Sequence, residues 1–104
     1  MTQKNSKNSE CHICMESEMT IYQAQQINTT LKQHIARCKK IELSLDAVNE
    51  LDTAGVQTLL MAKRAADKEG KGFCITSCSE TVTEVFELLN IADEFAGFVA
   101  ASKL

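Results

Sequence analysis

The stretch that decides the fold is residues 41–60, IELSLDAVNELDTAGVQTLL. Its first six residues, 41–46, alternate strictly between apolar and polar side chains, which is the period of a strand with one buried face. A sheet covered by helices on both faces reads as a continuous apolar run instead. The alternation therefore predicts a sheet with one solvated face and with its helices mainly on the other.

The second part of the stretch predicts a loop and then a helix. We expect the loop over residues 46–52. The helix begins at Asp52 or Thr53, because either side-chain oxygen can accept a hydrogen bond from a free backbone N–H. It runs to about Lys68, and Gly70 suits a left-handed cap at its end.

The residues before this stretch predict another strand and another helix. Residues 11–15 alternate as a half-buried strand does, a short turn follows at 16–18, and residues 19–21 are expected to continue the pairing. Residues 22–37 change to helical spacing, with apolar side chains on one face. Residues 1–9 are rich in Asn, Lys and Ser, and we expect them to form a flexible tail.

The residues after the stretch complete an α/β pattern. Residues 73–76 predict a third strand, Ser79 caps a further helix, and residues 91–98 suggest a final helix or helical turn. The predicted order is β-α-β-α-β-α-α. Strands separated by helices of this length lie in a parallel or mixed sheet. We expect a mixed sheet of about four strands in a single domain over residues 10–104.

Length and composition fit one small cytoplasmic domain. The 104 residues are 44% apolar and 24% charged, which is ordinary for a globular protein of one core. A net charge of −3 gives no electrostatic reason to bind nucleic acid or an anionic membrane. No apolar run is long enough to cross a bilayer, and residues 1–10 lack the apolar middle of a secretory signal. The five cysteines are an odd number, so we expect reduced thiols rather than disulfides.

Catalytic constellations are missing from the sequence. The four glycines are isolated rather than gathered in a phosphate-binding loop, and there is no serine elbow or paired-carboxylate motif. We therefore expect a protein that is not an enzyme and that needs no cofactor.

Residues 11–14, CHIC, raise the question of a metal or redox site. In a strand, Cys11 and Cys14 point to opposite faces, and a redox pair normally lies at a helix N-terminus instead. A zinc site would want a second pair of ligands, which the remaining cysteines do not cleanly supply, namely Cys38, Cys74 and Cys78. We expect no metal site, and we expect His12 and His34 to be surface residues.

Thr53 is the most informative position for function. Its hydroxyl is expected where a loop enters a helix, and a helix N-terminus tolerates a phosphate because of its free N–H groups and partial positive charge. A phosphate adds about −1.5 to −2 charge, which would oppose docking of any partner that fits the neutral surface. On local chemistry alone, the simpler alternative is that Thr53 only caps the helix.

The ordered pattern around Thr53 resembles a known family. Residues 41–46, followed by 51–60 (LDTAGVQTLL), closely resemble the core of STAS domains, the anti-sigma factor antagonists and their relatives. Residues 19–22 with the helix after them, and residues 72–75 followed by Ser79 and a helix, match the same family in order and spacing. The resemblance covers roughly residues 10–98 and implies a STAS-type α/β fold.

The resemblance also implies a phosphorylation site and a docking surface. In that family the hydroxyl residue directly after the motif aspartate is phosphorylated, and it maps onto Thr53. Family members bind a histidine-kinase-like serine/threonine kinase that is also an anti-sigma factor, and phosphorylation abolishes the binding. We expect the residues that contact the partner to be Asp52, Thr53, Ala54, Gly55, Gln57 and Thr58.

Two departures from the best-known antagonists leave the pathway open. Thr53 replaces the usual serine, and Val56-Gln57 replaces the Leu-Gly that often follows the motif glycine. Both features look more like STAS proteins outside the sigma-factor pathway. One such group is a cytoplasmic subunit that supports the ATPase of a bacterial phospholipid ABC transporter, and another appears alongside chemotaxis signalling proteins.

Overall fold

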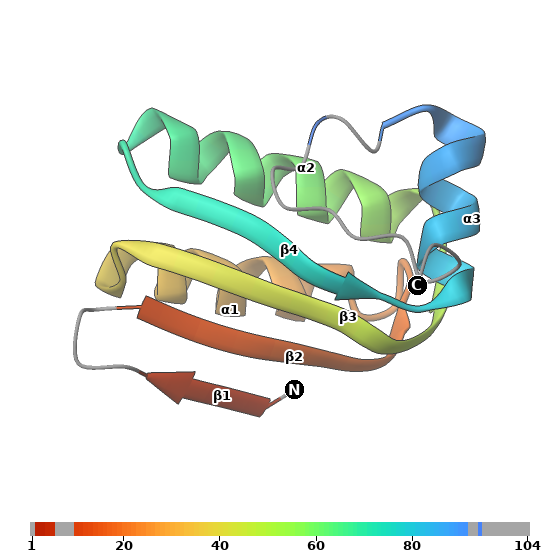
Figure 1. Cartoon of the computed structure of the whole chain (residues 1–104), viewed down its shortest axis with the longest axis horizontal. Coiled ribbons are helices and arrows are strands. Elements are labelled where there is room, and N and C mark those ends of the chain that lie inside the picture. Colours follow the sequence, from red (N-terminus) through yellow and green to blue (C-terminus); the bar gives the residue numbers. More distant parts are fainter. Residues whose placement is uncertain (1, 6–9, 92–93, 95–104) are drawn as a thin grey trace.

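A computed structural model of the chain, which describes residues 2–5, 10–91 and 94, shows a four-stranded sheet with three helices (Figure 1). The strands lie in the order β1-β2-β3-β4, with β1 antiparallel to β2 and the other neighbours parallel. This confirms the predicted mixed α/β sheet of four strands. The elements are β1 (Thr2–Asn5), β2 (Glu10–Met19), α1 (Ala24–Arg37), β3 (Lys40–Leu51), α2 (Thr53–Lys68), β4 (Gly72–Cys78) and α3 (Glu80–Leu89).

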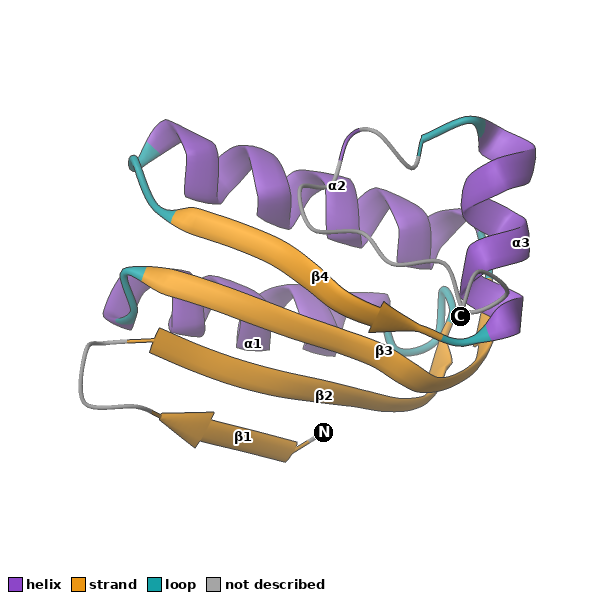
Figure 2. Ribbon diagram, in the orientation of Figure 1, coloured by secondary structure: helices purple, strands orange, loops and turns teal. Residues whose placement is uncertain are grey.

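The core lies between the sheet and the three helices, and α3 contributes Val82 and Phe86 to it. Figure 2 shows α1 and α2 side by side behind the same face of the sheet, while α3 packs at one end. The apolar residues of β3 that alternation assigned to the buried face, Ile41, Leu43 and Leu45, are completely buried. The period-2 pattern of residues 41–46 therefore placed the core correctly.

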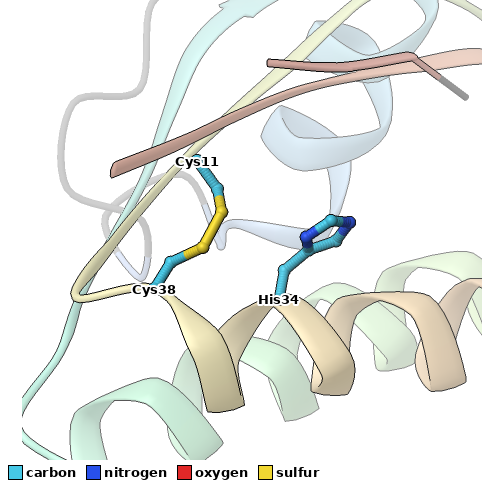
Figure 3. A group of neighbouring side chains, drawn as sticks. All are labelled: Cys11, His34 and Cys38. Atoms are coloured by element: carbon cyan, nitrogen blue, oxygen red, sulfur yellow. A yellow bond between two sulfur atoms is a disulfide. The ribbon is translucent and has the colours of Figure 1, made fainter. Parts of the chain in front are cut away.

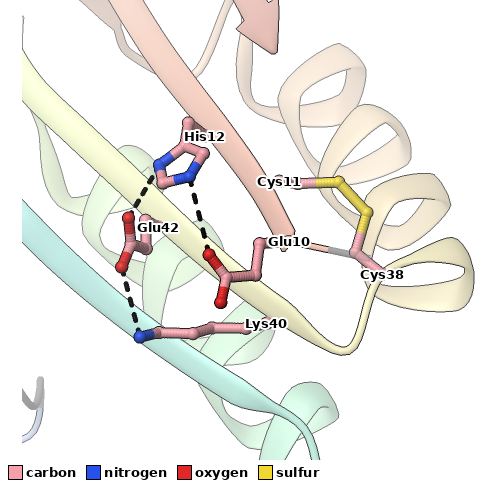
Figure 4. A network of polar contacts seen from close by, with 6 residues as sticks. All are labelled: Glu10, Cys11, His12, Cys38, Lys40 and Glu42. Carbon is pink, nitrogen blue, oxygen red and sulfur yellow. Dashed lines mark ion pairs between the residues drawn. A yellow bond between two sulfur atoms is a disulfide. The ribbon is translucent and has the colours of Figure 1, made fainter. Parts of the chain in front are cut away.

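The opposite face of the sheet carries polar side chains, as predicted. Figure 4 shows His12 of β2 between two carboxylates, with its Nδ1 2.7 Å from Glu42 Oε1 and its Nε2 3.8 Å from Glu10 Oε1. Lys40 Nζ lies 3.2 Å from the other oxygen of Glu42. Partly exposed pairs of this kind contribute little to stability. We therefore expect this network on the solvated face to add little to the stability of the sheet.

The predicted loop over residues 46–52 is wrong for most of its length, because β3 continues to Leu51. Residues 47–51 keep pairing with β2, from Ala47 opposite Glu16 to Leu51 opposite Met19. Val48 is completely buried, as a strand residue of the inner face would be. The strict apolar/polar alternation ends after residue 46 because the pairing register shifts there. A strand that continues past such a shift no longer shows the two-residue period by which a sequence reveals it.

The predicted turn at residues 16–18 is also wrong, since β2 runs without interruption through them. The register against β3 shifts between Cys14 and Glu16 and again between Ser17 and Glu18. Ser17 has a φ of 64°, in the left-handed region. At each shift β3 carries one residue more than β2, and an extra residue of this kind forms a bulge, which bends and twists the strands without ending them.

The N-terminal end of the chain differs from the expectation. Within the expected tail, β1 pairs with the start of β2, from Thr2 opposite Cys14 to Asn5 opposite Cys11. An edge strand is held by backbone hydrogen bonds to a single neighbour, so its sequence need not show an apolar pattern. The final helical turn expected over residues 91–98 lies mostly outside the described residues.

The remaining boundaries agree with the expectations. Helices α1 and α2 begin and end within two residues of their predicted limits, and β4 contains the predicted strand at residues 73–76. Gly70 adopts the left-handed conformation after α2, with a φ of 71°. Ser79 caps α3, accepting a hydrogen bond from the Val82 backbone N–H. Among the helices of the described part, none is both long and apolar enough to cross a membrane.

Candidate functional site

Asp52 is the single residue between the end of β3 and the start of α2, and its side chain organises this junction. Its Oδ1 accepts a hydrogen bond of 3.0 Å from the Gly55 backbone N–H, which makes Asp52 the N-cap of α2. Its Oδ2 accepts a second bond of 3.0 Å from the backbone N–H of Ile21, 31 residues earlier in the chain. These bonds from Gly55 and Ile21 stabilise the carboxylate and lower the pKa of Asp52. One side chain thus fixes both the start of α2 and the loop between β2 and α1.

Thr53 is the first residue of α2 and is exposed. Because Asp52 provides the cap, the alternative that Thr53 serves only as the N-cap is wrong. Among the described residues, the Thr53 hydroxyl has no hydrogen-bond partner. The hydroxyl therefore stands free at the positive end of a 16-residue helix, where a covalently attached phosphate would meet solvent rather than core.

Gly55 lets the first turn of α2 approach the end of β2. A Cβ at this position would overlap the carbonyl oxygen of Met19 and would lie 2.7 Å from Leu51 Cδ1. The same Met19 oxygen accepts a hydrogen bond of 3.3 Å from the Asp52 backbone N–H. The motif glycine is thus required by close packing of backbone against backbone, which no other residue permits.

The residues expected to contact a partner divide into two groups. Ala54 is partly exposed and Gln57, one turn after Thr53, is exposed, so both are available beside Asp52 and Thr53. Gly55 and Thr58 are buried, and the Thr58 hydroxyl donates to the Ala54 carbonyl oxygen at 2.9 Å. These two residues shape α2 and its packing, and they offer little surface to a partner.

Two exposed apolar residues in the loop before α1 escaped the sequence prediction. Ile21 and Tyr22 are 67% and 89% exposed, although large apolar side chains are usually buried. The pattern assigned Ile21 to a strand and Tyr22 to a helix. The structure instead places them in a turn that the Thr20 and Gln23 side chains close with a 2.6 Å hydrogen bond. We define the Thr53 face as these two residues together with the exposed Thr53 and Gln57 and the partly exposed Asp52 and Ala54.

Acidic side chains stand beside this face. Glu18 of β2 and Glu50 of β3 are exposed and lie opposite one another in the pairing register, each one residue before the end of its strand. With Asp52 they give three carboxylates at this end of the sheet. In the described part of the chain, the Thr53 face therefore combines an apolar pair, a free hydroxyl and a negative rim.

The cysteines behave partly as expected. Cys11 is buried and Cys14 exposed, which confirms that the two ends of the CHIC run point to opposite faces of the sheet. Cys14, Cys74 and Cys78 are free thiols, and burial raises the pKa of Cys78 to about 12, so this thiol is inert at neutral pH.

Two expectations about these residues are wrong. Cys11 and Cys38 are joined by a disulfide instead of remaining reduced, because the start of β2 and the end of α1 meet there (Figure 3). His34 is buried at 4% exposure rather than at the surface, since it lies on the face of α1 that packs toward the sheet.

Comparisons with known proteins agree with this arrangement. A family model described as "Mlab, STAS domain" matches residues 2–100. A crystal structure of an anti-sigma factor antagonist from Thermotoga maritima superposes with a TM-score of 0.83 at 18% identity, covering 98% of this chain and 88% of that one. The anti-sigma factor antagonist SpoIIAA in its unphosphorylated form gives a TM-score of 0.78 at 16% identity, with the same coverage.

The phosphorylated form of the Bacillus cell fate determinant SpoIIAA is also similar. It superposes with a TM-score of 0.73 at 15% identity, covering 98% of this chain and 91% of that one. Identities this low establish a shared fold, which confirms the STAS-type sheet and helices. Because the family model spans nearly the whole chain, from residue 2 to residue 100, the chain belongs to the STAS domain family.

Proposed function

We propose that this protein is a non-catalytic cytoplasmic signalling module that docks on a partner protein through the Thr53 face, and that phosphorylation of Thr53 ends the docking. The observation that supports this most directly is the free, exposed hydroxyl of Thr53 at the start of α2. Ile21, whose backbone N–H bonds to the Asp52 carboxylate, and the following Tyr22 are exposed apolar residues of the kind that partner proteins cover.

The local charges explain how a phosphate would act as a switch. A phosphate on Thr53 adds about −1.5 to −2 charge next to the Asp52 carboxylate, in a region where Glu18 and Glu50 are already negative. The N–H groups of α2 offset part of this repulsion, so the domain stays folded. A partner surface that fits the neutral hydroxyl, in contrast, meets a bulky, strongly hydrated dianion. Binding is lost while the fold is kept.

The chemistry of the face also describes the partner. A complementary surface carries an apolar pocket for Ile21 and Tyr22, ringed by lysine or arginine side chains that face the three carboxylates. The family resemblance supports a histidine-kinase-like serine/threonine kinase that is also an anti-sigma factor as this partner, and with it a proposed role in transcription regulation.

The test compares Thr53 variants as bait for affinity capture in the native cell, with the captured proteins identified by mass spectrometry. Thr53→Ala should retain the partner, and Thr53→Glu should lose it. The matched control is Thr76→Glu, which adds the same charge at an exposed threonine of β4. Equal capture by both Thr53 variants would remove the switch, and equal loss by Thr53→Glu and Thr76→Glu would assign the effect to net charge.

A second candidate is a constitutive subunit that supports the ATPase of a phospholipid ABC transporter. The departures at Thr53 and at Val56-Gln57 favour it, and so does the large exposed area of Tyr22, which suits a lasting interface. In that case the Thr53 hydroxyl itself contacts the ATPase. Thr53→Ala would then lower the ATPase activity of the complex, whereas the phospho-switch predicts that Thr53→Ala is harmless.

A further inference from the structure

The end of the sheet away from Thr53 holds a second cluster of reactive side chains, Cys11, His34 and Cys38, which we call the cysteine cluster. Cys11 begins the buried face of β2, while His34 and Cys38 lie one turn apart at the end of α1. The Cys38 backbone N–H donates to the His34 carbonyl oxygen at 2.8 Å, which fixes the spacing of these two residues. All three are buried, and one ligand atom from each lies within 4.8 Å of the others.

His34 is the member of this cluster whose burial needs an explanation. Its Nδ1 is buried without a hydrogen-bond partner, and it is the one such side-chain atom in the described part of the chain. A buried polar atom with no partner is costly, and natural proteins keep few of them without a use. Figure 3 shows the imidazole of His34 reaching from α1 into the space beneath β2 where the two sulfur atoms lie. Packing alone would be served as well by an apolar residue here.

We propose that, when the disulfide is reduced, Cys11, Cys38 and His34 form a binding site for one zinc ion. Two thiolates and one imidazole are zinc ligands, and the His34-x-x-x-Cys38 spacing is a normal one for ligands on a single segment. Ligand atoms around a tetrahedral zinc lie roughly 3.5 Å apart, so rotations of the three side chains suffice to close the site from its present geometry. The fourth position is left to a water molecule or another small ligand.

Charge favours zinc over a monovalent soft ion. Two thiolates and Zn²⁺ sum to zero charge, so the occupied site places no net charge in the core. A copper(I) ion on the same ligands would leave one uncompensated negative charge there. The neutral imidazole of His34 contributes only a lone pair.

The disulfide and the metal site exclude one another, because both use the same two sulfur atoms. Opening the site takes two electrons and two protons from a dithiol reductant, which becomes a disulfide as Cys11 and Cys38 become thiols. Zinc then displaces the two thiol protons and forms two Zn–S bonds. Either state ties β2 to the end of α1, so the fold is held at this corner whether the compartment is oxidising or reducing.

The test begins with the full chain, reduced and then freed of reductant without oxygen. Titration with Co²⁺, a spectroscopic substitute for zinc, should give an intense sulfur-to-cobalt absorption band that saturates at one equivalent, and Zn²⁺ should abolish it. Protein with the disulfide intact should give no band. X-ray absorption of the zinc-loaded protein should show two sulfur ligands at about 2.3 Å.

Variants separate this site from the other thiols. Cys38→Ser should lose the cobalt band, and Cys14→Ser, which removes an exposed cysteine of the same strand as Cys11, should keep it. His34→Gln should weaken zinc binding by at least about tenfold, the loss seen even for outer hydrogen-bond partners of metal ligands. Circular dichroism of each variant checks the fold.

Three results would overturn the proposal. One is the absence of a sulfur-to-cobalt band in the reduced wild-type protein, and another is a zinc shell of oxygen and nitrogen only. The third is a band that disappears with Cys14→Ser but survives Cys38→Ser. The first two need no variant, so the proposal stays testable if a substituted protein fails to fold.

Discussion

The two ends of the sheet differ in almost every respect that matters for function. At the carboxyl ends of β2 and β3, Thr53 is exposed and free, and Asp52 bonds to backbone groups from two segments. At the amino ends of the same strands, Cys11 and its partner Cys38 are buried and covalently joined. One end is exposed at its central residue, and the other is buried and closed by a covalent bond.

This contrast suggests that the two ends have separate roles, one in binding and the other in stability. We expect the Thr53 face to accept a charge without loss of the fold, because the Thr53 side chain is exposed. The cysteine cluster cannot change without affecting how α1 is held to β2. We therefore expect changes at the cysteine cluster to appear as stability, and changes at Thr53 to appear as binding. The following predictions would break or sharpen this division.

Reduction of the Cys11–Cys38 disulfide should have the largest effect on stability. The bond joins residues 27 apart in sequence, and closing a loop of that size stabilises a protein by about 3.5 kcal/mol in the chain-entropy account. Urea unfolding with and without reductant, in the presence of a chelator, measures the difference. Added zinc should recover part of it. An unchanged unfolding midpoint on reduction would mean that this corner contributes little to holding the fold.

Gly55→Ala should cost about 3 kcal/mol of unfolding free energy, the upper part of the usual range for overpacking. The new methyl group overlaps the Met19 carbonyl oxygen, and neither backbone segment can move without breaking the Asp52 bonds. Gly72→Ala is the matched control, since its methyl group would lie 3.1 Å from the flexible Lys40 side chain. Equal losses for both variants would show that the approach at Gly55 is not special.

Ser79→Ala should cost about 1 kcal/mol, the usual loss for removal of a helix cap. The Ser79 hydroxyl accepts from the Val82 backbone N–H at 3.2 Å and donates to the Val48 carbonyl oxygen at 2.5 Å. It therefore joins α3 to the part of β3 that the sequence suggested was a loop. Thr29→Ala, at an exposed helical position, is the control and should change the urea midpoint far less.

The smallest expected effect is the contribution of Asp52 to the loss of stability in acid. Hydrogen bonds lower the pKa of Asp52 in the folded protein below its ordinary value of 3.8, so the unfolded chain binds the proton first as pH falls. The contribution of Asp52 to stability is thus complete above the unfolded pKa and is lost as pH falls through the folded one. Comparison of urea midpoints at neutral and strongly acidic pH should show a smaller drop for Asp52→Asn than for the wild type. Parallel drops would contradict the role of these bonds.

The sequence revealed the carboxyl end of the sheet better than the amino end, for a physical reason. The alternation of residues 41–46 and the cap at Asp52 are local signals, spread over a few neighbouring residues. The contact between Cys11 and Cys38, and the bond from Ile21 to Asp52, join segments 27 and 31 residues apart. Nothing in a single sequence reports such pairings. The extension of β3 was missed because a register shift broke its period.

The most direct test of the central claim is the affinity of the purified partner for the chain with and without a phosphate on Thr53. The phosphothreonine can be installed during synthesis, and phosphothreonine at position 76 of β4 serves as the control. Modification of Thr53 should weaken binding by at least about tenfold, because a dianion enters a fitted, already acidic interface. Modification at position 76 should leave the affinity unchanged. Equal affinity of the unmodified and Thr53-phosphorylated proteins would contradict the account.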